Sequence, residues 1–155
     1  MQEIIDVISK ADPPFDALSN FYPNGFVLDG VKCASMEGFL QSLKTRSVKN
    51  QEKVCLLSGK TAKRYFERKI NNLWWKITGN LYWRGKKIKR CSDEYQRLLD
   101  RAYEAMSEAP DLIKALKATG NATLIHTIGK CDCRKTVLTE YEFVSRLERI
   151  RSNLQ

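Results

Sequence analysis

The sequence lacks the features that mark membrane-spanning, repetitive and multidomain proteins. Its apolar stretches are only a few residues long, so none of them could cross a bilayer. It has no internal repeat, no low-complexity linker and no apolar leader. With 43% hydrophobic and 29% charged residues over 155 positions, the composition is that of a folded domain with one core. We therefore expect a single cytoplasmic domain over residues 1–155 with no membrane partner.

Histidine and cysteine are too scarce to indicate a metal site. His126 is the single histidine, and among five cysteines only Cys131 and Cys133 lie close together in sequence. Structural zinc takes a full set of Cys and His ligands in wider pairs, so one Cys-x-Cys is a weak signal. An odd number of cysteines without a secretory leader favours reduced thiols. The Cys131/Cys133 pair is either incidental or a redox-sensitive pair of thiols.

Positive charge is in excess. The chain has 27 Lys and Arg against 18 Asp and Glu, a formal net charge of +9, which attracts phosphates, nucleotides or nucleic acid. The cations are densest in residues 60–68 and 84–90, where they are either solvated or steer an anionic substrate. Aromatic residues adjoin cations at Trp74-Trp75-Lys76 and around Trp83, as in single-stranded nucleic-acid contacts. We expect Trp74 in the core and leave Trp75 or Trp83 as possible contacts.

Local signals predict a helix-rich α+β fold with a small sheet. Asp29-Gly30 between two apolar triplets favours a type I′ turn and therefore a β-hairpin. Ser35 is placed to cap a helix from Met36 to about Arg46. Further helices are expected at residues 51–57, 61–68, 93–106 with Ser92 as cap, 110–120, and from Thr139, where Thr139 and Glu142 form a capping box; residues 4–8 read as a short strand.

On the first of these helices, Glu37, Gln41 and Lys44 lie at positions i, i+4 and i+7 and share one stripe beside an apolar stripe. The ordinary interpretation is a surface Glu and Lys arrangement. The alternative is the wall of a site, because a carboxylate can activate water, protonate a leaving group or stabilise an oxocarbenium-like transition state in glycosidic cleavage. Spacing alone leaves both interpretations open.

A wider pattern carries a family resemblance. It consists of residues 18–23 (Leu-Ser-Asn-Phe-Tyr-Pro), the Ser-x-Glu-x-x-x-Gln-x-x-Lys run of residues 35–44, residues 116–121 and residues 124–127. In order and spacing these segments resemble the NADAR family of YbiA-like N-glycosidases, over about residues 15–150. The resemblance implies a YbiA-like α+β fold and hydrolysis of the N-glycosidic bond of a phosphoribosyl or ADP-ribosyl compound. ADP-ribosylated nucleic acid is one form of such a substrate. The motifs suggest no obligatory cofactor.

Matching positions imply roles for individual residues. Glu37 would be the catalytic carboxylate that holds or deprotonates water against the anomeric carbon, and Lys44 would pair with a substrate phosphate. Asn20 and Gln41 would line the pocket. Phe21 and Tyr22 could offer a base a stacking face. The further substrate contacts that we expect are Trp83, Gly129 and Lys130.

The chain departs from the family pattern after the His126-Thr127 pair. YbiA-like members carry a Trp-Gly-x-Gly loop with a nearby acidic residue, whereas this chain reads Ile-Gly-Lys-Cys-Asp-Cys from residue 128. Gly129 and Lys130 could still form a phosphate-facing turn. Asp132 either replaces the missing carboxylate or serves its own backbone turn. His126 could act as a general base or be a structural histidine.

The altered loop leaves a second function open. A non-catalytic module that binds ADP-ribose or nucleic acid on the same fold needs no second acidic group.

Overall fold

Seven α-helices and three two-stranded sheets make up the fold, and the computed structural model describes residues 1–155. The helices are α1 (Met36–Ser42), α2 (Val48–Cys55), α3 (Gly59–Arg64), α4 (Ile70–Thr78), α5 (Asp93–Met106), α6 (Pro110–Ala118) and α7 (Glu140–Asn153), with a 3-10 turn at Phe15–Leu18. The strands are β1 (Ile4–Asp6), β2 (Phe26–Leu28), β3 (Val31–Cys33), β4 (Asn80–Trp83), β5 (Lys86–Lys89) and β6 (Thr123–Ile125). The prediction of a helix-rich α+β fold is confirmed.

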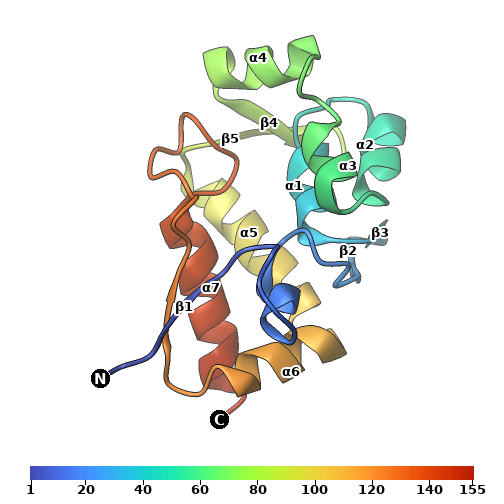
Figure 1. Cartoon of the computed structure of the whole chain (residues 1–155). Coiled ribbons are helices and arrows are strands. Elements are labelled where there is room, and N and C mark those ends of the chain that lie inside the picture. The colour runs from blue at the N-terminus through green and yellow to red at the C-terminus, as the bar shows by residue number, and fades with distance from the viewer.

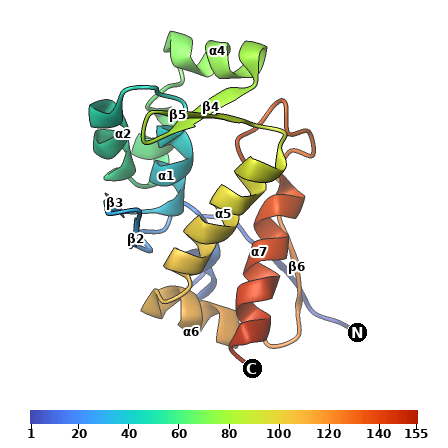
Figure 2. The same cartoon turned by 180° about the vertical axis from the view of Figure 1, so that it is seen from behind.

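The long helices α5 and α7 lie side by side, and α6 crosses their lower ends (Figure 1). From behind, α1, α2 and α3 gather on the other side of α5, while α4 and the β4–β5 hairpin form the far end of the molecule (Figure 2). The chain between β6 and α7 loops back toward this end. The site described below is therefore built from segments that are far apart in sequence.

Helix α1 is the centre of the packing, since all seven of its residues are buried. The Ser35 hydroxyl accepts a hydrogen bond from the Gly38 N–H, which confirms Ser35 as the cap. A Cβ at Gly38 would lie 2.4 Å from the carbonyl oxygen of Leu57, so only glycine lets α1 approach the end of α2 this closely. This contact sets which face of α1 remains for the site.

Most of the turns and helix caps predicted from the sequence are present in the structure. Asp29 and Gly30 have φ of 49° and 79°, as the type I′ hairpin turn requires. Ser92 caps α5, and Thr139 and Glu142 form the capping box of α7. Helix α1 ends at Ser42 rather than near Arg46, because the N–H groups that follow bond to carbonyls three residues back.

Two expectations about the far end of the molecule are wrong or incomplete. Trp74 is 54% exposed, whereas Trp75 is 3% exposed, so Trp75 rather than Trp74 is the core residue of this pair. The exposed side of α4 continues through Ile70, Leu73 and Ile77. The β4–β5 hairpin was not predicted, although its Arg84-Gly85 turn has φ of 52° and 84°, much like the first hairpin turn.

The prediction that all cysteines are reduced thiols is wrong for one pair. Cys91 and Cys133 form a disulfide, while Cys33, Cys55 and Cys131 remain free. The sequence could not show this, because the two cysteines are 42 residues apart and meet only when the β6–α7 loop packs on the β5–α5 junction. None of the helices combines the length and the apolar character that a membrane span needs.

The first and last strands fix the position of the single histidine. β1 pairs in parallel with β6, and the Val7 N–H extends the ladder to the carbonyl oxygen of Ile125. The carbonyl oxygen of Val7 then lies 2.7 Å from Nδ1 of His126. Residues near the two ends of the chain thus position one side of the site.

Candidate active site

A cavity of about 600 Å³ opens between α1, α3, α4 and the β6–α7 loop. Its walls include eight of the residues that sequence reasoning selected. These are Asn20, Phe21, Glu37, Gln41, Lys44, His126, Gly129 and Lys130. Segments that are more than 80 residues apart in sequence therefore meet around one concave surface.

Glu37 lies in this wall with 8% of its surface exposed. Its Oε1 accepts a hydrogen bond of 3.0 Å from Nε2 of Gln41, one helical turn further along. The Oε1 atom of Gln41 is buried and has no hydrogen-bond partner in the chain. A buried acceptor without a donor is costly, so a bound hydroxyl or water at this point would be stabilising.

The backbone and side chain of Asn20 connect this pair to the core. The Glu37 N–H donates to the carbonyl oxygen of Asn20 at 3.0 Å, and the Tyr103 hydroxyl donates to Oδ1 of Asn20 at 2.9 Å. Burial raises the pKa of Tyr103, so its hydroxyl stays protonated and remains a donor. With Oδ1 occupied in this way, the amide nitrogen of Asn20 is the group left for a ligand.

Lys44 lies two residues beyond the end of α1 and lines the same cavity wall. Its Nζ donates to Oδ1 of Asn72 at 3.0 Å and lies 5.9 Å from the ring centroid of Trp75, both on α4. Burial lowers the pKa of Lys44 to about 8, and the carboxylate of Glu37 opposes this shift while Lys76 and Lys63 add to it. The ammonium group is thus a partly desolvated cation without a carboxylate in direct contact.

Positive charge dominates the cavity. Its wall carries seven Lys and Arg side chains but only two carboxylates, Glu37 and Glu67. The cations are Lys44, Lys60, Lys63, Arg64, Lys76, Lys130 and Lys135. Such a wall of like charges favours an anion with more than one negative charge.

His126 and Gly129 form the side opposite α1. The Val7 carbonyl can only accept, so Nδ1 of His126 carries the hydrogen, and Nε2 is the acceptor in the neutral ring. The imidazole packs edge-on against Phe143 with centroids 5.1 Å apart. A Cβ at Gly129 would lie 2.7 Å from Cδ2 of His126, so a larger residue would displace the ring.

Three residues expected in the site lie outside the cavity wall. The Tyr22 hydroxyl donates to Asp111 at 2.8 Å. Trp83 is 5% exposed, and its indole N–H donates to Asp29 at 2.8 Å. The carboxylate of Asp132 bonds the backbone and guanidinium of Arg134, and these bonds lower its pKa. Each side chain is occupied by a structural partner.

The structure adds wall residues that sequence reasoning missed. Asn72 and Lys76 come from α4, a helix that was not predicted. Trp75 of the same helix, which was named with Trp83 as a candidate contact, also lines the wall. Lys60, Lys63 and Arg64 also line the wall, whereas the sequence had marked them only as part of the cation-dense run of residues 60–68. The sequence does carry a signal for α4, because apolar residues recur at helical spacing between Lys69 and Thr78. The two adjacent tryptophans and the neighbouring cations in this segment also fit a nucleic-acid contact.

Comparisons with known proteins agree with this geometry at the level of the fold. A family model described as bacteriophage protein GP30.3 matches residues 14–152. The chain belongs to this family. A relative with a similar sequence is an uncharacterized 17.1 kDa protein in the Gp30-rIII intergenic region of Enterobacteria phage T4. It is 34% identical over 155 residues, which cover 97% of this chain and 98% of that protein.

A solved structure with a similar fold is the NMR structure of the E. coli protein YbiA. The two align with a TM-score of 0.62 over 99% of this chain and 86% of YbiA, at 21% identity. This similarity confirms the prediction of a YbiA-like fold. At such low identity it shows the fold alone, and activity must be argued from the site.

Proposed function

We propose that this chain hydrolyses the N-glycosidic bond of a phosphoribosyl or ADP-ribosyl compound. The observation that carries the proposal is a buried carboxylate, Glu37, within a cavity that is otherwise lined by cations. The cations suit the phosphates of the substrate, and the carboxylate suits the positive charge that develops at the anomeric carbon. The YbiA-like fold supports the proposal.

The geometry suggests how Glu37 would act. Gln41 occupies Oε1 of Glu37, which leaves Oε2 to orient a water molecule. As the bond between the anomeric carbon and the base nitrogen breaks, the water oxygen bonds to that carbon and its proton passes to Glu37. The departing base then takes up a proton, from Glu37 or from solvent. The unpartnered Oε1 of Gln41 would accept from a ribose hydroxyl or from the water.

Other wall residues would bind the rest of the substrate. Lys44, Lys130 and Lys135 would pair with phosphate oxygens. Phe21 would offer its face to a base, and the amide nitrogen of Asn20 would donate to the sugar. His126 would keep its ring fixed against Phe143 and present Nε2 to the cavity.

A more specific version of this proposal is that the ribosyl group of the substrate is attached to nucleic acid. Residues 60–90 contain eleven Lys and Arg but a single acidic residue, whereas the whole chain has 27 and 18. All of the net positive charge therefore resides in α3, α4 and the β4–β5 hairpin, next to the cavity. A polyanion that carries the ribosyl group would be attracted to this region.

A non-catalytic binding module is the second candidate. It is favoured by one observation: Asp132, expected as the second acidic group, is bonded to Arg134 outside the cavity wall. A hydrolase would then have Glu37 and the imidazole of His126 at the cavity, but no acidic side chain from the β6–α7 loop. A binder would retain the cations and need no carboxylate.

The deciding experiment is product analysis by mass spectrometry with a panel of phosphoribosyl, ADP-ribosyl and ADP-ribosylated-DNA substrates. Glu37→Gln should lower kcat by about 10²–10⁴-fold with little change in KM, because a positioned base acts mainly in the transition state. Glu67→Gln is the matched control, since it removes the other, exposed carboxylate of the wall. Binding without release of base from any substrate would favour the second candidate, and equal activity of Glu37→Gln and wild type would remove Glu37 from catalysis.

A further inference from the structure

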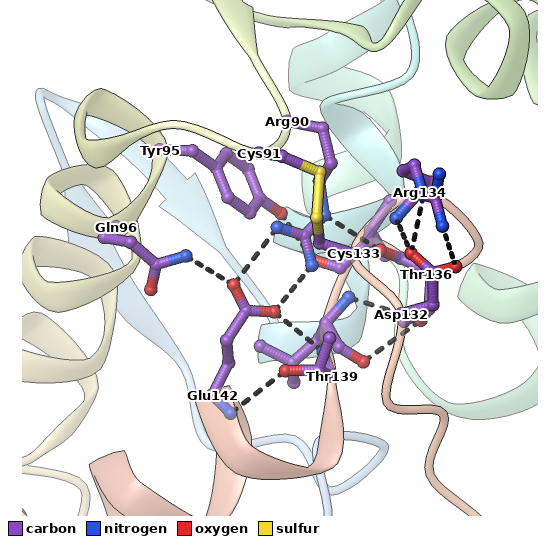
Figure 3. Close-up of polar contacts among 12 residues, drawn as sticks. Arg90, Cys91, Tyr95, Gln96, Asp132, Cys133, Arg134, Thr136, Thr139 and Glu142 are labelled. Carbon is purple, nitrogen blue, oxygen red and sulfur yellow. Dashed lines mark hydrogen bonds and ion pairs between the residues drawn. A yellow bond between two sulfur atoms is a disulfide. The ribbon is translucent and has the colours of Figure 1, made fainter.

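The disulfide between Cys91 and Cys133 joins the β6–α7 loop to the segment that precedes α5 (Figure 3). Cys91 lies at the junction of β5 and α5, directly before the cap of α5. Cys133 lies in the β6–α7 loop, which supplies Lys130 and Lys135 to the cavity wall. A covalent bond therefore connects the N-terminal end of α5 with the β6–α7 loop, which carries Lys130 and Lys135.

The end of this loop that leads into α7 is held without the disulfide. Arg90 and Glu142 form a buried ion pair of 2.6 Å, with 1% and 7% of their side chains exposed. Nε of Arg90 donates to the carbonyl oxygen of Thr136 at 2.8 Å, and the Thr139 N–H donates to Glu142 at 2.8 Å. Figure 3 shows these contacts around the disulfide. Together they fix residues 136–139 independently of the sulfur atoms.

The start of the loop is also held by hydrogen bonds. The Gly129 N–H donates to the carbonyl oxygen of His126 at 3.0 Å, and the Glu140 N–H donates to that of Lys130 at 3.0 Å. The loop is thus fixed at both ends, at residues 126–130 and at residues 136–139.

Residues 131–135 between these ends are different. Their hydrogen bonds and their ion pair run only among themselves, from Arg134 and the Lys135 N–H to Asp132. No hydrogen bond joins them to the rest of the chain, so the disulfide is their one specific link to it. Cutting this link should release the segment while the Arg90–Glu142 cluster keeps the fold intact.

We propose that Cys91–Cys133 is a reversible thiol–disulfide switch that fixes residues 131–135 at the cavity and so sets its affinity for anions. Cys91 is exposed and Cys133 partly exposed, which gives a dithiol reductant access. A thiolate of the reductant attacks one sulfur, and the other leaves as a thiolate and takes up a proton. The second thiol of the reductant then releases the remaining cysteine and closes its own disulfide, so two electrons pass to the protein.

The consequence for ligands rests on the proposed function, because it requires that the cavity bind a phosphorylated compound. In the oxidised protein Lys135 is held at the cavity wall. In the reduced protein its backbone can move away, and the ordering of that segment must be regained on binding. The reduced form should therefore bind ADP-ribose about two- to fivefold more weakly, the size of effect expected for one exposed charge.

Limited trypsin digestion tests the switch without any reference to function, because Lys130, Arg134 and Lys135 are cleavage sites within or beside the released segment. The oxidised protein should resist cleavage there, and dithiothreitol should speed it about tenfold as the segment opens. Cys91→Ser should behave like the reduced wild type. Cys131→Ser is the matched control, since this exposed cysteine of the same segment is outside the disulfide and its loss should leave the oxidised protein resistant.

Each outcome has a defined meaning. Equal cleavage with and without dithiothreitol would overturn the switch, as would alkylation of Cys91 by iodoacetamide in protein that has been treated with oxidised glutathione. A change in cleavage with unchanged affinity for ADP-ribose would overturn the link to anion binding. Failure of both redox forms to bind ADP-ribose would count against the proposed function while the cleavage result still decided the switch.

Discussion

Lys44 should make anion binding depend on pH above neutrality. Its pKa is lowered to about 8 because the ammonium group is partly buried, with Glu37 opposing the shift and Lys76 and Lys63 adding to it. The protonated form is the one that pairs with a phosphate, so binding should weaken as pH rises through this value. The pyrophosphate of ADP-ribose does not change its charge in that range, which makes it a suitable probe.

The magnitude follows from the fraction of Lys44 that is protonated in the free protein. With a pKa of about 8, this fraction is about 90% at pH 7 and about 10% at pH 9. If only the ammonium form binds, the dissociation constant of ADP-ribose should rise about tenfold between these two pH values, equivalent to about 1.4 kcal/mol. Any direct binding to the neutral amine would reduce this factor.

Lys44→Arg is the matched variant, because a guanidinium stays charged throughout this range and can still pair with phosphate. Isothermal titration calorimetry at pH 7, 8 and 9 should therefore give a steep profile for wild type and a nearly flat one for Lys44→Arg. Parallel profiles for the two proteins would refute the assignment of the titration to Lys44. Retained binding with complete loss of turnover in Lys44→Arg would move Lys44 from phosphate pairing to a role in bond making.

Two further predictions concern stability and the charged hairpin. Glu142→Ala leaves the buried guanidinium of Arg90 without its partner and should lower the free energy of unfolding by about 3–5 kcal/mol in urea titrations; a loss below about 1 kcal/mol would contradict the importance given to this pair. Neutralising the three exposed lysines of β5 should change the melting temperature little, since the one ion pair among them, from Lys86 to Glu94, is exposed. The three lysines, Lys86, Lys87 and Lys89, lie outside the cavity wall, so neutralising all of them should raise the apparent KM only at low salt. An increase in KM that persists at high salt would indicate direct contact with the substrate instead.

Sequence by itself determined the elements whose signals are local. The Asp29-Gly30 turn, the serine caps and the Thr139 capping box each depend on residues within a few positions of one another. The grouping of Glu37 and Gln41 is local in the same sense, because these two residues lie one turn apart on α1. Lys44 lies beyond the end of α1, and its hydrogen bond to Asn72 of α4 holds it beside them. The family pattern then selected these residues as a site, and the catalytic roles remain predictions.

Only the tertiary structure decided what each local feature faces. Helix α1 is buried on all sides, so its polar stripe meets a cavity rather than solvent, and this depends on the close approach of Gly38 to Leu57. Trp74 and Trp75 are adjacent in sequence, yet the packing of α4 buries one and exposes the other. Neither the pairing of Cys91 with Cys133 nor the contact of Lys44 with Asn72 has a local signal. These contacts form between segments distant along the chain, and their energies depend on burial and geometry that only the folded protein supplies.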